Sequence, residues 1–145
     1  MLERRTLLVG GSGILAAAIA GDALAMDGGK HSMAMPMQMS MQDCINKCWS
    51  SHVMCLQTAA TLMATGHRAQ LAAMLNDCAE ICQATANSMI RGSTLHAVLC
   101  GACAEACERC AAECGMGSGD NGLAHCAATC RECAEACRQM AAMKS

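Results

Sequence analysis

The chain has 145 residues, which is enough for one small domain, and a formal net charge of only −2. This near-neutral balance gives no reason to expect nucleic acid or an anionic membrane as a partner. The composition is rich in sulfur, with 14 Cys and 14 Met but no Tyr, no Phe and one Trp. Because Cys and Met are themselves apolar, they can build a core where large aliphatic residues are scarce.

Residues 1–25 have the features of an export signal. The pair Arg4-Arg5 precedes an apolar stretch that is too short to span a bilayer as a mature helix, and residues 23–25 offer an A-x-A cleavage site. The pair resembles a twin-arginine signal, although Leu7 stands where such signals usually have Phe. An ordinary general-secretion signal is the alternative. Both routes predict a periplasmic protein, cleaved near Ala25, with no stable membrane insertion.

Residues 26–41 form a Met-rich segment that we expect to be flexible. Its methionines alternate around Pro36, and a period of two with a proline does not suit a helix. Two interpretations stand side by side. The segment is either a disordered tail or, since thioethers favour Cu(I), an arm that collects soft metal ions.

Regularly spaced cysteines organise the rest of the chain, residues 42–145. Between Cys100 and Cys114 they recur at steps of 3, 4, 3 and 4, the spacing that normally carries Leu or Ile in a helix core. The residues between them are good helix formers with charge on the opposite side. Similar spacing returns between Cys126 and Cys137. We therefore predict helices whose buried stripes consist of thiols.

The periodicity predicts four helices, over residues 42–65, 68–90, 94–114 and 123–143. Gly66 and Gly92 would end the first two. Ser93 is a candidate N-cap for the third, and Asp120 or Asn121 for the fourth. Because the connections are short, neighbouring helices should run antiparallel. The expected fold is all-α, an up-down-up-down four-helix bundle with a Cys-lined core.

So many inward-facing thiols need a chemical explanation. A disulfide framework is the default for an exported Cys-rich chain, but Cβ atoms at helical spacing lie about 5–6 Å apart, whereas a disulfide needs about 3.8 Å. Two thiolates joined by a metal fit the longer spacing, with metal–sulfur bonds of about 2.3 Å. Disulfides between helices and a soft apolar core stay as alternatives. The candidate metal ligands are Cys44, Cys48, Cys55, Cys78, Cys82, Cys100, Cys103, Cys107, Cys110, Cys114, Cys126, Cys130, Cys133 and Cys137.

Among thiophilic metals the spacing favours Cu(I). Buried thiolates without cations would be prohibitively costly, so many cations must enter with them. Zinc prefers closed tetrahedral sites, and iron–sulfur clusters are usually held by loops. Cu(I) accepts two thiolates in a near-linear arrangement and tolerates Met and His. We predict multiple Cu(I) ions per chain, with zinc or cadmium buffering and a disulfide-linked redox protein as alternatives.

The sequence resembles the four-helix-bundle copper storage proteins of methane-oxidising and other bacteria, over essentially the whole mature region. The resemblance rests on the exported Met-rich start and on the Cys-x-x-x-Cys pairs Cys44/Cys48, Cys78/Cys82, Cys103/Cys107, Cys110/Cys114, Cys126/Cys130 and Cys133/Cys137. It implies that pairs of inward thiolates bind many Cu(I) ions and that the chain forms a homo-tetramer. In methanotrophs it implies copper supply to particulate methane monooxygenase.

The resemblance also implies that His and Met at one open end of the bundle admit copper. By position this role falls to Met63, His67 and Met74, with Met116 and His125 near by. The alternative is that these are ordinary side chains at helix ends.

No enzymatic site is expected. The sequence offers no Ser-His-Asp set, no paired buried carboxylates and no phosphate-binding loop. A thiol–disulfide or copper-oxidising enzyme would need one distinctive cysteine of low pKa, or a mixed-ligand site with an open position. Near-equivalent thiols on core faces argue against both, so we predict a binding protein.

Overall fold

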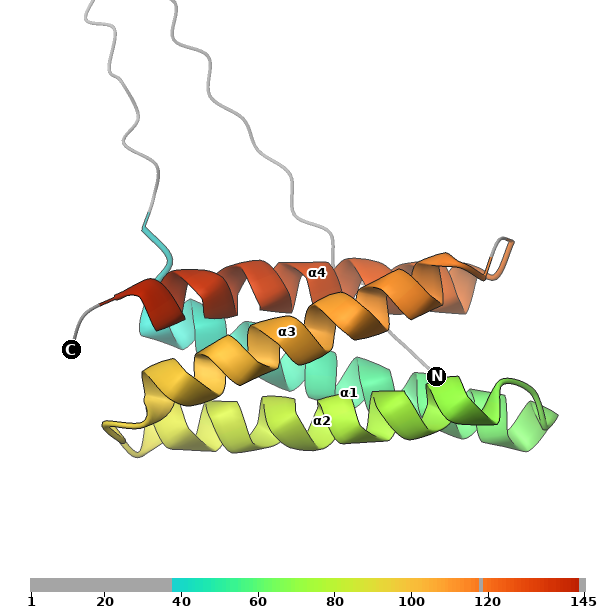
Figure 1. The fold of residues 1–145 in the computed structure, drawn as a ribbon, viewed down its shortest axis with the longest axis horizontal. Coiled ribbons are helices and arrows are strands. Elements are labelled where there is room, and N and C mark those ends of the chain that lie inside the picture. Colours follow the sequence, from blue (N-terminus) through green and yellow to red (C-terminus); the bar gives the residue numbers. More distant parts are fainter. Residues whose placement is uncertain (1–37, 118, 144–145) are drawn as a thin grey trace, which may run out of the picture. The chain divides into compact units, whose positions relative to one another are not determined.

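A computed structural model describes residues 38–117 and 119–143 of the chain. Its elements are four α-helices, α1 (Met41–Thr65), α2 (Ala69–Ile90), α3 (His96–Gly115) and α4 (Asn121–Ala142). Consecutive helices run in opposite directions, and α4 packs back against α1 (Figure 1). The described residues contain no β-strand. The predicted all-α, up-down-up-down four-helix bundle is confirmed.

The predicted export signal (1–25) lies outside the described residues, as does most of the Met-rich segment (26–41). Of that segment the structure describes residues 38–41, and Met41 is already the first residue of α1. None of the described helices has the combination of length and apolar sequence that a bilayer crossing requires.

The first helix is fixed at both ends by local hydrogen bonds. The Ser40 hydroxyl accepts from the Asp43 amide at 3.1 Å, while the Asp43 carboxylate accepts from the Ser40 amide at 3.3 Å. This reciprocal capping box starts α1 one residue earlier than predicted. The helix ends at Thr65 and is followed by Gly66, whose φ of 69° lies in the left-handed region that favours glycine, as expected for a C-terminal cap.

The start of α3 differs from the prediction. Ser93 was expected to cap a helix from residue 94, but the helix begins at His96 and its N-cap position is Leu95, without a side-chain cap. The Ser93 hydroxyl instead accepts from the Leu95 amide at 3.2 Å, and its carbonyl accepts from the His96 amide at 3.1 Å. Ser93 therefore stabilises the turn before the helix. The expected role of Asp120 at α4 is confirmed, because its carboxylate accepts from the amides of Gly122 and Leu123.

The core is built of cysteine and alanine in its middle and of larger side chains at its ends. Every cysteine is at most 1% exposed. Small alanines such as Ala79 and Ala134 fill the space between them. Four buried leucines, Leu62, Leu71, Leu75 and Leu123, occupy the end where α1 turns into α2. Ile45, Met89 and Met140 are large buried side chains toward the opposite end.

Candidate metal centre

Each helix turns a row of cysteines toward the bundle interior. Three come from α1, two from α2, five from α3 and four from α4. All fourteen are buried free thiols. We call these fourteen side chains the thiol column. The alternative of disulfides between helices finds no support in the described part of the chain.

Thiols from different helices lie in direct contact. The Sγ atoms of Cys55 and Cys130 are 3.6 Å apart, those of Cys78 and Cys107 are 3.7 Å apart, and the distance from Cys82 to Cys107 is 3.5 Å. A disulfide would bring the two sulfurs to about 2.05 Å. The contacts are thiol hydrogen bonds that join α1 to α4 and α2 to α3.

Most of the thiol column divides into overlapping groups. In each group every Sγ atom lies within 4.8 Å of the others. The groups are Cys44/Cys100/Cys137, Cys48/Cys103/Cys133/Cys137, Cys82/Cys103/Cys107/Cys133, Cys78/Cys107/Cys130 and Cys55/Cys126/Cys130. Because neighbouring groups share members, the thiols form one connected series rather than isolated sites.

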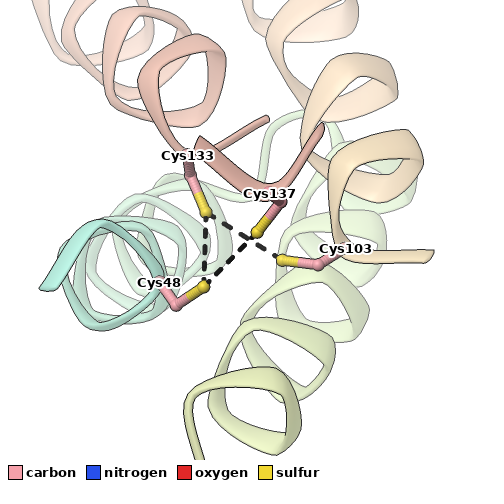
Figure 2. Close-up of side chains that lie close together, drawn as sticks. All are labelled: Cys48, Cys103, Cys133 and Cys137. Carbon is pink, nitrogen blue, oxygen red and sulfur yellow. Dashed lines mark hydrogen bonds between the residues drawn. The ribbon is translucent and has the colours of Figure 1, made fainter. Parts of the chain in front are cut away.

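Figure 2 shows one group of four, contributed by α1, α3 and α4. The Sγ atom of Cys48 lies 3.5 Å from that of Cys137 and 3.9 Å from that of Cys133, which is in turn 3.9 Å from Cys103. A linear sulfur–metal–sulfur unit separates its sulfurs by about 4.5 Å. Small side-chain rotations would therefore admit a metal ion between two thiols that are in contact, such as Cys48 and Cys133.

Two predicted ligands stand outside the groups of three or four. The Cys110 thiol donates to the carbonyl oxygen of Met74 at 3.6 Å. Cys114, in the last turn of α3, interacts with Cys126 of α4. All the predicted cysteines thus lie in one connected core, and their role as ligands stays a prediction.

Contact among thiols separates their pKa values. Interactions with Cys103, Cys130 and Cys133 lower the pKa of Cys107 to about 2, against the effect of burial. Cys78 shows the opposite shift, since interactions with Cys107 and Cys110, together with burial, raise its pKa above the ordinary value of 9.0. A thiolate can be stabilised in this core when neighbouring thiols donate to it, while the donors keep their protons.

The predicted entry residues lie at the end of the bundle where α1 turns into α2, but they are not part of the thiol groups. Met63 is 59% exposed, and His67 is also exposed. Met74 is half-buried and packs against the core. The buried Leu71 and Leu75 lie on the same helix as Met74, so the structure puts aliphatic side chains beside the expected entrance.

The donor set fits a soft metal ion. The thiol groups contain only cysteine sulfur, with no histidine and no carboxylate in them. Hard ions such as Mg²⁺ and Ca²⁺ prefer oxygen ligands, whereas thiolates select Cu(I), zinc and related ions. Nearby His52 is engaged elsewhere, because its Nδ1 atom lies 2.9 Å from the carbonyl oxygen of Ala79.

Two core residues beside the thiols were not predicted as part of the site. The Ser51 hydroxyl lies 3.6 Å from the sulfurs of Cys107 and Cys130. The Met89 sulfur accepts from the Cys100 thiol at 3.8 Å. Both residues lie on the predicted Cys stripes, which was the available signal, but spacing alone does not show which side chains touch across helices.

Fold and site together define the class: a four-helix bundle whose core is a connected series of free thiols suited to soft metal ions. The model of the family described as "Copper storage protein" matches residues 30–142, and the chain belongs to this family.

Two solved structures resemble the bundle. A protein from Nitrosospira multiformis is 37% identical, with a TM-score of 0.65, and the match covers 72% of this chain and 96% of that one. The structure of "Cu(I)-bound Copper Storage Protein BsCsp3" is 30% identical, with a TM-score of 0.66, and the match covers 70% of this chain and 97% of that one. A search of curated proteins finds no match.

Proposed function

We propose that this chain stores Cu(I) ions in its thiol column and supplies them to exported or membrane copper enzymes. The observation that carries the proposal is the series of overlapping groups of buried, free thiols. The family membership and the Cu(I)-bound relative support the same metal.

Pairs of thiolates would hold each ion. Binding of Cu⁺ between two thiols releases their protons, and the complex keeps one negative charge. When a thiolate is shared by two ions, the negative charge per copper falls, which reduces the cost of burying the cluster. Shared members such as Cys107 and Cys130 would therefore allow many ions to lie close together in one core.

Shared ligands also give the ions a route through the bundle. An ion held by Cys48 and Cys133 can exchange one thiolate for Cys103, which belongs to the next group as well. Each step breaks one metal–sulfur bond while another forms, so no bare ion has to cross the core. The same arrangement suits storage better than catalysis, because turnover would need an open metal position for a substrate.

The proposal also covers the entry of copper into the bundle, the export of the protein and the delivery of copper to a recipient. Met63, His67 and Met74 would bind incoming copper at the end of the bundle where α1 turns into α2, as the resemblance implies. The arginine pair supports export of the folded chain by the twin-arginine route to the periplasm. Assembly into a tetramer, and particulate methane monooxygenase as the recipient in a methanotroph, rest on the family resemblance alone.

Anaerobic titration of the reduced, metal-free protein with Cu(I), in competition with a coloured chelator, tests the proposal. We expect more than about ten ions per chain, from two-thiolate sites with sharing. A plateau at one or two ions would indicate a chaperone or a structural site and overturn the storage function. Protein alkylated at its cysteines is the control and should bind almost none. A thiol count in the reduced protein should give the fourteen cysteines of the sequence.

A further inference from the structure

The core differs between the two ends of the bundle. Where α1 turns into α2, buried leucines separate the nearest thiols of these helices from the turn. Toward the opposite end, where α2 turns into α3 (Figure 1), buried sulfur-containing residues occur almost up to the helix termini. Cys44 lies in the first turns of α1, Cys100 in the first turns of α3, and Met89 is the second-last residue of α2.

Four sulfur atoms gather toward this second end, one from each helix. The thiols of Cys44, Cys100 and Cys137 form a group within 4.8 Å, and they come from α1, α3 and α4. The fourth sulfur is the thioether of Met89 on α2, which accepts from the Cys100 thiol at 3.8 Å. Met89 is only 2% exposed, so its sulfur faces the thiols rather than solvent.

We propose that Met89 supplies a thioether ligand to a mixed Cu(I) site with Cys100, at the end of the thiol column remote from Met63, His67 and Met74. The proposal rests on the storage function above and adds a ligand and a position to it. The separation of 3.8 Å is shorter than the roughly 4.5 Å of a linear sulfur–copper–sulfur unit. Methionine, with three rotatable bonds, can make up the difference without moving its helix.

A thioether changes the charge and proton balance of the site. Cu⁺ bound between one thiolate and one thioether forms a neutral unit, and only the Cys100 proton is released to solvent. A site of two thiolates releases up to two protons and keeps a negative charge. No electron is transferred in either case. Because the thioether carries no charge, it attracts Cu⁺ less strongly than a thiolate does, so the Met89 site fills last and empties first.

Met140 provides a matched control. It is buried to a similar degree, at 1% exposure, and lies near the end of α4 at the same end of the bundle. Among the described residues, no thiol donates a hydrogen bond to its sulfur, in contrast to Met89. Replacing either methionine by leucine conserves volume and removes one buried sulfur, so the two variants differ only in the proposed ligand.

The test is a Cu(I) titration of reduced protein labelled with ¹³C at the methionine methyl groups, followed by NMR under anaerobic conditions. Met89→Leu and Met140→Leu assign the two signals. We expect the Met89 methyl signal to shift over the last equivalents of copper, with a smaller change at Met140. In chelator competition, Met89→Leu should lose about one ion or release its most labile ion at least tenfold faster, whereas Met140→Leu behaves as the parent protein.

The outcomes separate this inference from the storage function. A Met89 signal that stays in place up to saturation, with normal total uptake, would show Met89 to be a core residue only. Equal behaviour of the two leucine variants would lead to the same conclusion. If the parent protein took up no Cu(I), the storage function itself would fail. The methyl signals can also be assigned from through-bond and NOE spectra of the parent protein, so the proposal stays testable even if a variant folds poorly.

Discussion

Ser51 places a hydroxyl group among the thiols of the core. Its side chain is fully buried, and its oxygen lies 3.6 Å from the sulfurs of Cys107 and Cys130 and 4.0 Å from that of Cys55. A neutral hydroxyl is a poor ligand for Cu(I), although it can donate a hydrogen bond to a thiolate. The serine therefore marks a place where the core has room for a ligand but lacks one.

Replacing Ser51 by cysteine should raise the capacity for Cu(I) by about one ion per chain, since sulfur would join two existing thiol groups. Chelator titration of the variant measures the change. Ser88→Cys is the matched control, because Ser88 is also fully buried but its hydroxyl has no hydrogen-bond partner within the described residues. An equal gain in both variants would show that any added thiol binds copper, and would contradict a specific role of position 51.

At the scale of the element, the capping box makes the start of α1 sensitive to one side chain. Ser40→Ala removes the hydroxyl that accepts from the Asp43 amide, and should lower the free energy of unfolding of the reduced apo protein by about 1 kcal/mol. Urea unfolding followed by circular dichroism measures the change. In Ser50→Ala, by contrast, only an exposed contact with the Asn46 carbonyl is lost, so the free energy should stay within about 0.5 kcal/mol of the parent value.

The helices were predictable from the sequence because thiol spacing and turn residues point to the same elements. The spacing of the cysteines between Cys100 and Cys114 predicted α3, and Gly66 predicted the end of α1. The start of α3 was predicted wrongly. Ser93 is of a residue type that often caps helices, but its hydroxyl accepts a hydrogen bond from the Leu95 amide in the turn before the helix. The contact between Cys100 and Met89 could not be predicted from the sequence either, because it depends on the rotation and register of two packed helices.

Two surface ion pairs join different helices and are consistent with the way in which the helices pack against one another. Lys47 of α1 pairs with Glu132 of α4, and Arg138 of α4 pairs with Glu108 of α3. All four side chains are between 40% and 59% exposed, so each pair adds no more than about 1 kcal/mol. Packing of the Cys- and Ala-rich faces, rather than these pairs, must therefore hold the helices together.

For the molecule as a whole, the apo protein should already be folded. Its core is closed by Cys, Ala and Leu without any metal, the side chains of Ser40 and Asp120 cap α1 and α4, and the helical segments have good local propensity. Circular dichroism of the reduced, metal-free protein should give a strongly helical spectrum that changes little when copper is added. A coil spectrum that becomes helical only with Cu(I) would show that metal binding drives folding, as in zinc fingers, and would contradict this prediction.

Copper affinity should rise with pH, because part of the thiol column holds its protons at neutral pH. Interaction with Cys126, followed by burial, raises the pKa of Cys114, and contact with Cys107 and Cys110 raises that of Cys78. Each of these thiols must lose a proton to bind Cu⁺. For each proton displaced, the affinity for Cu⁺ therefore rises about tenfold when the pH increases by one unit. The neighbouring thiols lower the pKa of Cys107, so we expect this cysteine to add less to the pH dependence. An ion bound between thiols of the two kinds should therefore release fewer than two protons.

Whereas copper affinity should rise with pH, the free energy of unfolding of the apo protein should fall as the pH becomes alkaline. A raised pKa, as at Cys78, contributes stability that is complete below the unfolded value of 9.0 and is lost as pH rises toward the folded value. The apo bundle should thus become easier to unfold in urea above about pH 9, while the copper-loaded bundle, which has no thiol protons to lose at its sites, should not. The lowered pKa of Cys107 contributes stability above pH 9.0 that disappears only as pH falls toward about 2, so it produces no loss of stability in the alkaline range.

Chelator competition and urea unfolding at matched pH values test both effects. A copper affinity that does not change with pH would mean that the thiols are already deprotonated in the apo core.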